Sequence, residues 1–427
     1  MKRYPKYKDS GVPWLGQVPE HWVTTKLSRL IDPRRRITYG IVQAGENVPG
    51  GVKYIRPVDM TDSNGVKDES LLRTTSYEIA EQYRRSAVKT GDVVFSIGPS
   101  YGKVMIVPSS LAGANLTQGT ARLAPANVVK AQFLFYALQS AFCKSQWDVS
   151  IGGATFGGLN LQPLARTLLV LPPRTEQDAI TQHLRQVCES LDHAISSQEL
   201  MIELLKERRS AIITQAVTKG LNPKAKMKDS GVPWLGQVPA HWELLRFKNL
   251  FCEMHLRRGC ELPAGSISYG KVVFKDDQDV HGPTKESYQA VLRGDFLINP
   301  INLNYDLKSL RTALSEIDVC VSPAYIVLKA SRRESPHYLR HLLYAFDLHH
   351  MKTLGSGVRH TITFDDIGSC VAVAPPISEQ EAIASFLGRQ LSQIDSAISS
   401  QERMIELLKE RRSAIITQAV TGQIDVR

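Results

Sequence analysis

The stretch AISSQELMIELLKERRSAIITQAVT at Ala194–Thr218 decides the fold, because it returns at Ala397–Thr421 with only Leu200 replaced, by Arg403. In both copies, and in the residues before them, apolar side chains recur at spacings of three and four. That pattern is typical of a long helix that packs along one face. About 40 residues, or roughly 60 Å of helix, lie between a Pro-Pro pair and a glycine in each copy. The sequence therefore predicts two equivalent long helices.

A helix of this length overhangs a single domain, so we expect the two helices to pack on each other as an antiparallel coiled coil. The alternative is that each helix packs only on its own domain. Ser378-Glu379-Gln380-Glu381 has the form of a capping box for the second helix, and Gly220 and Gly422 are expected to end the two helices. The pairing is assigned to apolar residues of both copies, namely Leu184, Leu191, Leu205, Ile212, Leu387, Ile394, Leu408 and Ile415.

A second block, KDSGVPWLGQVPEHW at Lys8–Trp22, returns at Lys228–Trp242 with Glu20 replaced by Ala240. The two repeated blocks frame two long stretches that barely resemble each other. Both stretches are rich in short β runs separated by Gly, Pro, Asn and Ser, and they carry a few helices, such as those expected at 131–147 and 336–353.

We predict an α+β chain in which two mostly β domains are joined by two long antiparallel helices with an approximate two-fold relation. The expected segments are the repeated N-terminal block (1–22), the first variable domain (23–171), the central helix (172–220), the second copy of the block (221–242), the second variable domain (243–374), and the C-terminal helix with its tail (375–427).

The amino-acid composition limits the classes to which this protein can belong. Hydrophobic residues make up 43% and charged residues 22%, which is ordinary for a globular chain, and no apolar run is long enough for a membrane span. We therefore expect a cytoplasmic protein that has no membrane partner. The net charge of +10 favours polyanionic partners. The six cysteines show no CxxC or Cys/His spacing, so we expect neither a metal site nor a disulfide.

The sequence contains no convincing catalytic motif. Gly98-Pro99-Ser100-Tyr101-Gly102 fits the nucleophile elbow GxSxG, but that motif needs a strand followed by a helix. The flanking segments VVFSI and KVMIV both have the composition of strands, which favours a hairpin. No phosphate-binding loop of the form GxxxxGK[ST] is present. We therefore expect no catalytic residue, metal or cofactor in this chain.

The order of the repeated motifs closely resembles the specificity subunit of type I restriction–modification systems. Each variable stretch is entered through SGVPWLGxVPxHW and is followed by a PP…EQ…AI helix that contains LLKERRSAIITQAVT. The stretch ITYGIVQ at 37–43 also resembles one common class of first target-recognition domain, whereas the second domain does not repeat it. The resemblance covers essentially the whole chain.

The resemblance implies a function. Each variable domain would read one half of a bipartite, asymmetric target in double-stranded DNA, and the helices would set the spacing and dock two methyltransferase subunits. Those partners would use S-adenosylmethionine to methylate adenine at N6, and motor–nuclease subunits would cut unmodified DNA with ATP and Mg²⁺. The alternative is a non-catalytic coiled-coil adaptor whose domains bind proteins. An adjacent adenine methyltransferase gene would favour the DNA-reading function.

Base reading needs side chains with several donors or acceptors, surrounded by Lys and Arg that contact phosphates. In the first domain the candidates are Arg34, Arg35, Arg36, Tyr39, Ser100, Tyr101, Lys103 and Gln118. In the second domain they are Arg257, Arg258, Asn299, Asn302, Asn304, Tyr305, Lys308, Arg359 and His360. The Glu207-Arg208-Arg209 cluster and its copy at 410–412 are open to three interpretations: contact with the DNA spacer, contact with a partner, or a solvated helix face.

Overall fold

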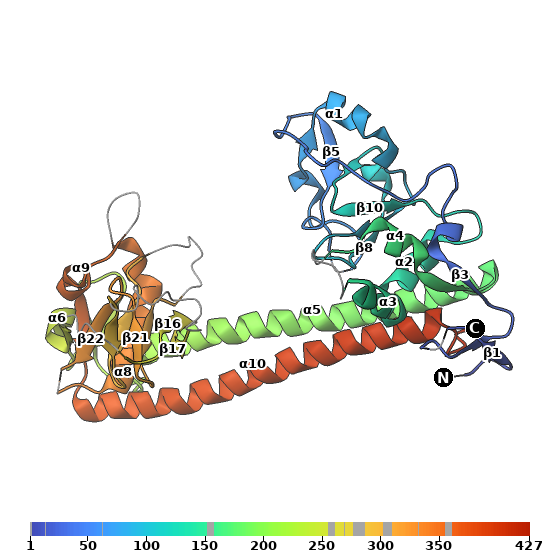
Figure 1. Ribbon diagram of the computed structural model, residues 1–427. Coiled ribbons are helices and arrows are strands. Elements are labelled where there is room, and N and C mark those ends of the chain that lie inside the picture. Colours follow the sequence, from blue (N-terminus) through green and yellow to red (C-terminus); the bar gives the residue numbers. More distant parts are fainter. Residues whose placement is uncertain are drawn as a thin grey trace. The chain divides into compact units, whose positions relative to one another are not determined.

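The computed structural model describes residues 2–12, 14–61, 63–151, 158–254, 261–268, 270–275, 287–301, 310–331, 333–354 and 361–427. The chain forms two compact units (Figure 1). Unit 1 contains residues 1–199 and 403–427, and unit 2 contains residues 200–402. Each unit combines helices with small sheets whose strands are mostly antiparallel, so the chain belongs to the α+β class.

Both units contain the same small hairpin, built from the repeated tryptophan block. Its strands are β1 (Tyr7–Asp9) and β2 (Gln17–Pro19) in unit 1, and β12 (Met227–Asp229) and β13 (Gln237–Pro239) in unit 2. After β1, the side chain of Asp9 accepts a hydrogen bond of 2.9 Å from the backbone N–H of Gly11. Gly11 has a φ of 73°, a left-handed conformation that glycine adopts without steric cost.

Unit 1 contains a four-stranded antiparallel sheet and a three-stranded sheet. The larger sheet has the order β4-β10-β7-β8, with β4 (Thr38–Tyr39), β7 (Val93–Ser96), β8 (Val104–Ile106) and β10 (Thr120–Leu123). The smaller sheet has the order β6-β5-β9, with β5 (Val52–Ile55), β6 (Thr74–Thr75) and β9 (Asn115–Leu116). A separate pair, β3 (Val23–Lys26) and β11 (Leu168–Leu171), joins the entry and exit of the domain. Short helices are α1 (Tyr77–Gln82) and α4 (Leu161–Arg166).

Unit 2 repeats the main features of this architecture. Its four-stranded antiparallel sheet has the order β15-β22-β19-β20, with β15 (Phe251–Glu253), β19 (Phe296–Ile298), β20 (Thr312–Leu314) and β22 (Ile326–Ala330). Three further pairs are β14 (Glu243–Arg246) with β23 (Val371–Ala374), β16 (Gly265–Ser268) with β17 (Lys271–Phe274), and β18 (Gln289–Val291) with β21 (Val319–Val321). Short helices are α6 (Phe247–Leu250) and α9 (Phe364–Ser369). Pair β14–β23 repeats the entry–exit pair of unit 1.

The helical segment expected at 131–147 in unit 1 forms two helices, α2 (Ala131–Gln139) and α3 (Ala141–Ile151). The break falls at Ser140, whose ψ of 145° is extended and whose side chain accepts a hydrogen bond from the N–H of Cys143. In unit 2 the segment expected at 336–353 forms α8 (Pro336–His349) and a 3-10 turn at Met351–Thr353.

The two long helices are α5 (Arg174–Lys219) and α10 (Ile377–Val420). Unit 1 takes the first half of α5 and the last part of α10, and unit 2 takes the complementary parts, as expected for antiparallel neighbours. Gly220 and Gly422 end the helices, each with a φ of 73°. Gly388 lies within α10 without interrupting it.

The predicted capping box of the second helix is wrong. Helix α10 already begins at Ile377, and none of the described hydrogen bonds joins Ser378 to Glu381. The reason is tertiary, because the next two side chains of this segment bind other elements of the fold.

A glutamate and a glutamine at the start of each long helix tie it to the rest of its unit. In unit 1, Glu176 contacts His21 Nε2 at 2.6 Å and accepts a hydrogen bond of 3.0 Å from Trp22 Nε1. The adjacent Gln177 accepts a hydrogen bond from the N–H of Lys130, directly before α2. Unit 2 repeats these contacts with Glu379, His241, Trp242, Gln380 and Ser335. The repeated His-Trp and Glu-Gln pairs are therefore explained by contacts that hold each unit together.

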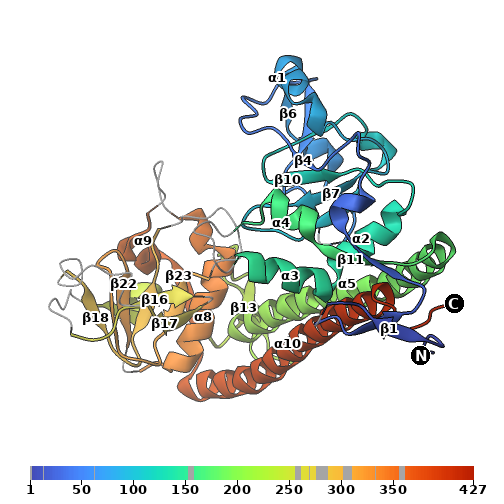
Figure 2. The same cartoon turned by 45° about the vertical axis from the view of Figure 1, so that its right-hand side comes forward.

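The two chain ends meet in unit 1 beside β1, as Figures 1 and 2 show. The backbone N–H of Asp425 donates to the carbonyl of Lys2 at 2.9 Å, and the guanidinium of Arg427 lies 4.9 Å from the ring centroid of Tyr4. Within the described residues, no helix has the length and apolar character that a membrane crossing requires.

The cysteines depart from expectation at one position. Cys143, Cys188, Cys252 and Cys370 are free thiols, but Cys320 is disulfide-bonded. The expectation that the chain forms no disulfide is therefore wrong. Spacing along the sequence reveals local ligand sets, whereas a disulfide depends on which cysteines the tertiary fold brings together.

Candidate nucleic-acid interface

Unit 1 contains a cavity of about 960 Å³ that is lined by seven basic side chains. Arg34, Arg35 and Arg36 come from the loop before β4, and Arg84 and Arg85 come from the 3-10 turn η3 (Arg84–Ser86). The other two are Lys89 and Arg122. We call these seven residues the arginine basin. No carboxylate is among the described residues that line it, so its electrostatic potential favours an anion.

Two members of the arginine basin have carboxylate partners. Arg35 forms a bidentate ion pair with Asp92, with both N···O distances at 2.6 Å, and the Asp92 side chain is only 3% exposed. Arg84 forms an exposed pair with Glu81 at 3.0 Å. Arg34 and Arg36 are exposed, and within the described residues their guanidinium groups form no ion pair. The triplet therefore combines one structural arginine with two that face solvent.

Arg122 is the most deeply buried cation of the arginine basin, with 5% of its surface exposed. Its guanidinium donates to the backbone carbonyls of Arg85 and Ala87 on one side and of Arg36 on the other. Burial, and then the charge of Arg35, lower the pKa of Arg122 from its ordinary value. One buried cation thus contacts both loops that carry the exposed arginines.

The predicted base-reading residues Tyr39 and Gln118 lie on neighbouring segments. Tyr39 is in β4, which pairs with β10, and its side chain is 46% exposed. The exposed Gln118 lies just before β10, and its backbone N–H donates to the carbonyl of Ile41 at 2.8 Å. Because Thr38 lines the arginine basin and Tyr39 follows it, this edge of the sheet begins where the basin ends.

The predicted loop at 98–102 forms the hairpin between β7 and β8, in agreement with the rejection of a nucleophile elbow. Ser100 is exposed, whereas Tyr101 and Lys103 are partly buried. Tyr101 donates a hydrogen bond to Asp148, and this bond raises the pKa of the phenol. The ammonium of Lys103 donates to the carbonyl of Met60 at 3.0 Å. Tyr101 and Lys103 therefore already take part in contacts within the unit.

In the second domain only Asn299, among the nine predicted DNA-binding residues, is described. It follows β19, and its side-chain oxygen accepts a hydrogen bond of 3.1 Å from the N–H of Ile301. The remaining candidates lie outside the described residues, namely Arg257, Arg258, Asn302, Asn304, Tyr305, Lys308, Arg359 and His360.

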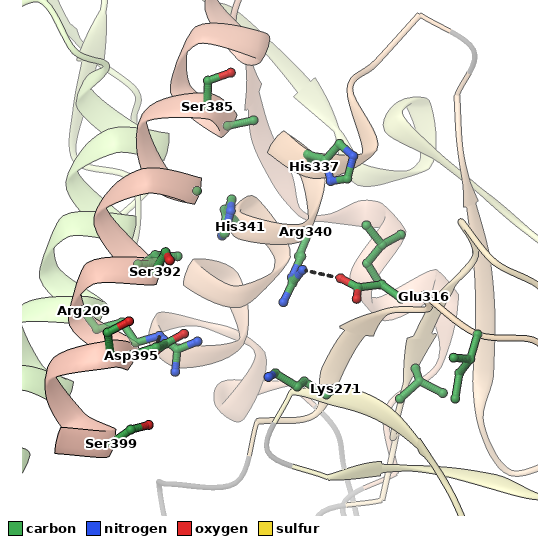
Figure 3. A pocket seen from close by; sticks show the side chains of 17 residues that line it. Arg209, Lys271, Glu316, His337, Arg340, His341, Ser385, Ser392, Asp395 and Ser399 are labelled. Atoms are coloured by element: carbon green, nitrogen blue, oxygen red, sulfur yellow. Dashed lines mark hydrogen bonds and ion pairs between the residues drawn. The ribbon is translucent and has the colours of Figure 1, made fainter. Parts of the chain in front are cut away.

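Unit 2 has a groove of about 1010 Å³ between α8 and α10, shown in Figure 3. Arg340 pairs with Glu316 at 3.2 Å, and Arg209 lies 3.8 Å from Asp395. Burial, and then the charges of Arg340 and Arg209, lower the pKa of His341 to about 4, so this imidazole is neutral at pH 7. The groove therefore carries cations and carboxylates in nearly equal number.

Unit 1 has an equivalent groove of about 620 Å³ between α2 and α5. The repeat places Asp192 where unit 2 has Asp395, and Arg412 where unit 2 has Arg209, and the two pair at 3.2 Å. Arg185 occupies the position of Gly388, which explains part of the difference in volume.

The residues assigned to helix pairing are mostly buried within their own units. Leu184, Leu191 and Ile415 share one core with the partly buried Leu408 in unit 1. Leu387 shares a core with the partly buried Ile212 in unit 2. Ile394 is also buried, and Leu205 is partly buried.

Sequence reasoning missed four members of the arginine basin. The dipeptide Arg84-Arg85 was a visible signal of the same kind as the Arg34–Arg36 triplet. Lys89 and Arg122 gave no signal, because each is a single basic residue whose neighbours in space come from distant segments.

Comparisons with known proteins agree with this architecture. Residues 19–200 match the family model described as the type I restriction modification DNA specificity domain. The chain is 31% identical over 171 residues to the type I restriction enzyme EcoBI specificity subunit of Escherichia coli, an alignment that spans 40% of this chain and 35% of that subunit. It is 22% identical over 433 residues to the putative type I restriction enzyme MjaX specificity subunit of Methanocaldococcus jannaschii, covering 97% and 96% of the two chains.

The fold is also similar to that of a solved chain from a study of complex assembly and conformational transition of the type I R-M system. That similarity has a TM-score of 0.66 at 16% identity, and it covers 95% of this chain and 99% of the other. The class defined by fold and sequence is thus that of DNA specificity domains. Residues 19–200 carry the DNA specificity domain of this family, and over nearly its whole length the chain is similar to a type I restriction–modification specificity subunit. Members of this family are non-catalytic DNA-recognition subunits of restriction–modification complexes.

Proposed function

We propose that each unit of this chain reads one half of a bipartite, asymmetric DNA target. The observation that carries the proposal is the arginine basin of unit 1, which joins an exposed edge bearing Tyr39 and Gln118. Cations that contact phosphates beside side chains that reach base edges are the two parts of a sequence-reading surface. The two domains carry different loops on the same frame, which supports two unlike half-sites.

We propose further that the frame docks two copies of one partner, a methyltransferase subunit. Met201 and Leu204 of α5 are 46% and 50% exposed, and their copies Met404 and Leu407 of α10 are 46% and 43% exposed. In each copy the two side chains are three residues apart and share a helix face. An identical exposed apolar pair on each long helix supports docking of two equivalent partners.

The chemistry would then belong to the partners. The methyltransferase subunits would bind S-adenosylmethionine and methylate adenine at N6, and motor–nuclease subunits would use ATP and Mg²⁺. The long helices would set the length of the unread spacer between the half-sites. A cytoplasmic location is part of the same proposal, because the DNA target and the partner subunits are there.

Methylome sequencing of a host that carries the complete system tests the proposal. Substitution of Tyr39 and Gln118 by alanine is expected to alter or abolish one half of the methylated motif and to leave the sequence of the other half unchanged. Substitution of Asn302 and Asn304 is expected to alter only the opposite half. Loss of specificity in both halves from either pair of substitutions would contradict the assignment of one half to each unit.

A further inference from the structure

The charges of the three large polar cavities point to different ligands. In the α8–α10 groove of unit 2, Arg209, Lys271 and Arg340 face two carboxylates, a net charge of +1 (Figure 3). In the equivalent groove of unit 1, three cations face three carboxylates, namely Lys130, Arg185, Arg412, Asp178, Glu189 and Asp192. In the arginine basin, among the described residues, seven cations are offset by the carboxylates of Asp92, Glu81 and Asp32, a net charge of +4. Only the basin has a large uncompensated charge.

Packing alone does not explain why a positively charged side chain, Arg122, is buried in this cationic site. Arg122 is 5% exposed, and its Nε has no hydrogen-bond partner among the residues that the structure describes. A buried cation is costly unless it is paired; the charges of Asp92 and Asp32 favour the charged form of Arg122, but Asp92 pairs directly with Arg35. Arg122 is also repelled by the charge of Arg35. An anion in the cavity would offset this repulsion.

The contacts of Arg122 also organise the cavity. Its two terminal nitrogens bind the carbonyl of Arg36 on one rim and the carbonyls of Arg85 and Ala87 on the other. Both rims carry cations that form no ion pair within the described residues, Arg34 and Arg36 on the first, and Arg85 and Lys89 on the second. The planar guanidinium fixes the two rims at one separation, which a flexible ammonium cannot do.

The basin lies directly beside the predicted reading edge. In the pairing of β4 with β10, Arg122 lies opposite Thr38, and the next pair is Ala121 opposite Tyr39. Successive side chains of a strand point to opposite faces, so Tyr39 follows the basin along the edge of the sheet, and a DNA strand whose phosphates contact the basin would reach Tyr39 by passing around that edge. Phosphate contacts that fix the register of a duplex next to base contacts are the usual division of labour in DNA recognition.

We propose that the arginine basin binds consecutive backbone phosphates of DNA and that Arg122 is a positioning residue that holds its two rims apart. This assignment rests on the proposed function, because it supposes that DNA is the ligand of unit 1. It goes beyond that function in separating the phosphate contacts, which are independent of sequence, from the contacts of Tyr39 and Gln118.

The first test is the salt dependence of binding between the full chain and a duplex of unrelated sequence. Each phosphate contact contributes about 0.9 to the slope of log K against log[salt]. Arg36→Gln combined with Arg85→Gln should therefore lower the slope by about 1.8, so that affinity falls about 12-fold less between 50 and 200 mM salt. Arg29→Gln combined with Lys144→Gln is the control, because it removes the same charge from exposed positions of unit 1 outside the basin.

Each outcome of this test is decisive. A lower slope for the basin variant, with the control unchanged, supports the assignment. An unchanged slope for a basin variant that still binds DNA overturns the assignment and leaves the proposed function standing. An equal decrease in basin variant and control also overturns it, because the charge would then act without a defined site. A wild-type chain that does not bind duplex DNA at 50 mM salt overturns both proposals.

The second test concerns Arg122. Arg122→Lys keeps the charge but cannot bind both rims, so it should lower the salt slope although the number of cations is unchanged. Adding Arg36→Gln to Arg122→Lys should then change the slope by less than Arg36→Gln alone, because Arg36 is already displaced. Additive effects, or a wild-type slope in a folded Arg122→Lys chain, would contradict positioning. Failure of Arg122→Lys to fold would assign Arg122 to stability alone.

Discussion

The three adjacent arginines at 34–36 are expected to behave differently when each is replaced by alanine. Arg35 forms two hydrogen bonds of 2.6 Å to Asp92, whose side chain is 3% exposed. Removing one partner of a buried pair typically costs 3–5 kcal/mol. Arg35 is 22% exposed, and Asp92 keeps a hydrogen bond of 2.7 Å from the N–H of Lys89. We therefore expect Arg35→Ala to cost about 3 kcal/mol, at the lower end of that range.

Arg34→Ala is the matched control, because Arg34 is the exposed neighbour in the same loop. Surface substitutions of this kind usually change the free energy of unfolding by less than about 0.5 kcal/mol. The assay is hydrogen exchange of peptides from β7 and β10, with peptides from unit 2 as the internal reference. A cost of about 3 kcal/mol corresponds to roughly 150-fold faster exchange in unit 1 if those amides exchange by unfolding of the unit.

A second variant identifies the cause of the loss. Replacing both partners, as in Arg35→Met with Asp92→Leu, removes the buried charge and should recover much of the lost stability. Equal exchange rates for Arg35→Ala and Arg34→Ala would refute the reasoning, because the buried pair would then contribute nothing. The result also matters for DNA binding, since replacement of all three arginines would combine loss of cations with loss of structure.

Three further predictions concern stability. Trp234→Ala should lower the free energy of unfolding by about 3–5 kcal/mol, because the indole is 9% exposed and its ring centroid lies 5.4 Å from that of Phe346. Trp14→Ala should cost less than about 1 kcal/mol, because the side chain of Trp14, the counterpart of Trp234 in the first repeat, is 65% exposed. Equal shifts in the urea midpoints of the two units would contradict this. Because the pKa of His341 is lowered to about 4 in the folded state, unit 2 should lose stability as the pH falls from about 6.5 to 4 and the unfolded chain takes up a proton first. Over that range the unfolding free energy of wild-type unit 2 should fall by at most about 3 kcal/mol more than that of His341→Gln. Parallel pH profiles of stability for the two proteins would show that His341 does not cause the loss. Gly388→Ala should raise the unfolding free energy of unit 2 by about 0.5–1 kcal/mol, because alanine favours the helix more than glycine does and the added Cβ would meet no atom within 4 Å. A lower melting temperature of the variant would show that α10 needs glycine at this position.

Several features of the fold follow from the sequence because they depend on local chemistry or on repetition. The long helices follow from their apolar spacing, and their ends follow from Gly220 and Gly422, where a left-handed residue is needed. The hairpin at 98–102 follows from two flanking strand segments, and it correctly excluded a nucleophile elbow. The helix at 131–147 was predicted as one element, but the chain breaks at Ser140, where the backbone is extended and the side chain accepts a hydrogen bond from the N–H of Cys143.

The candidate site was only partly predictable for the same reason. The Arg34–Arg36 triplet was visible as a local cluster of charge, but its division into Arg35, which binds Asp92, and two solvent-facing arginines was not. Asp92 is 57 residues away in the chain, so no local pattern connects the two. Lys89 and Arg122 joined the cluster only through the pairing of strands and loops that are distant in sequence.

The sequence alone determined that the chain has two unlike α+β domains on a duplicated frame, because repetition and helical period are properties of the order of residues. The tertiary structure decided what identical residues do in different surroundings. Trp14 and Trp234 belong to almost identical blocks, yet one is exposed and the other packs on Phe247 and Phe346. Burial and charge compensation depend on which distant side chains arrive at a position, and only the folded chain specifies those neighbours.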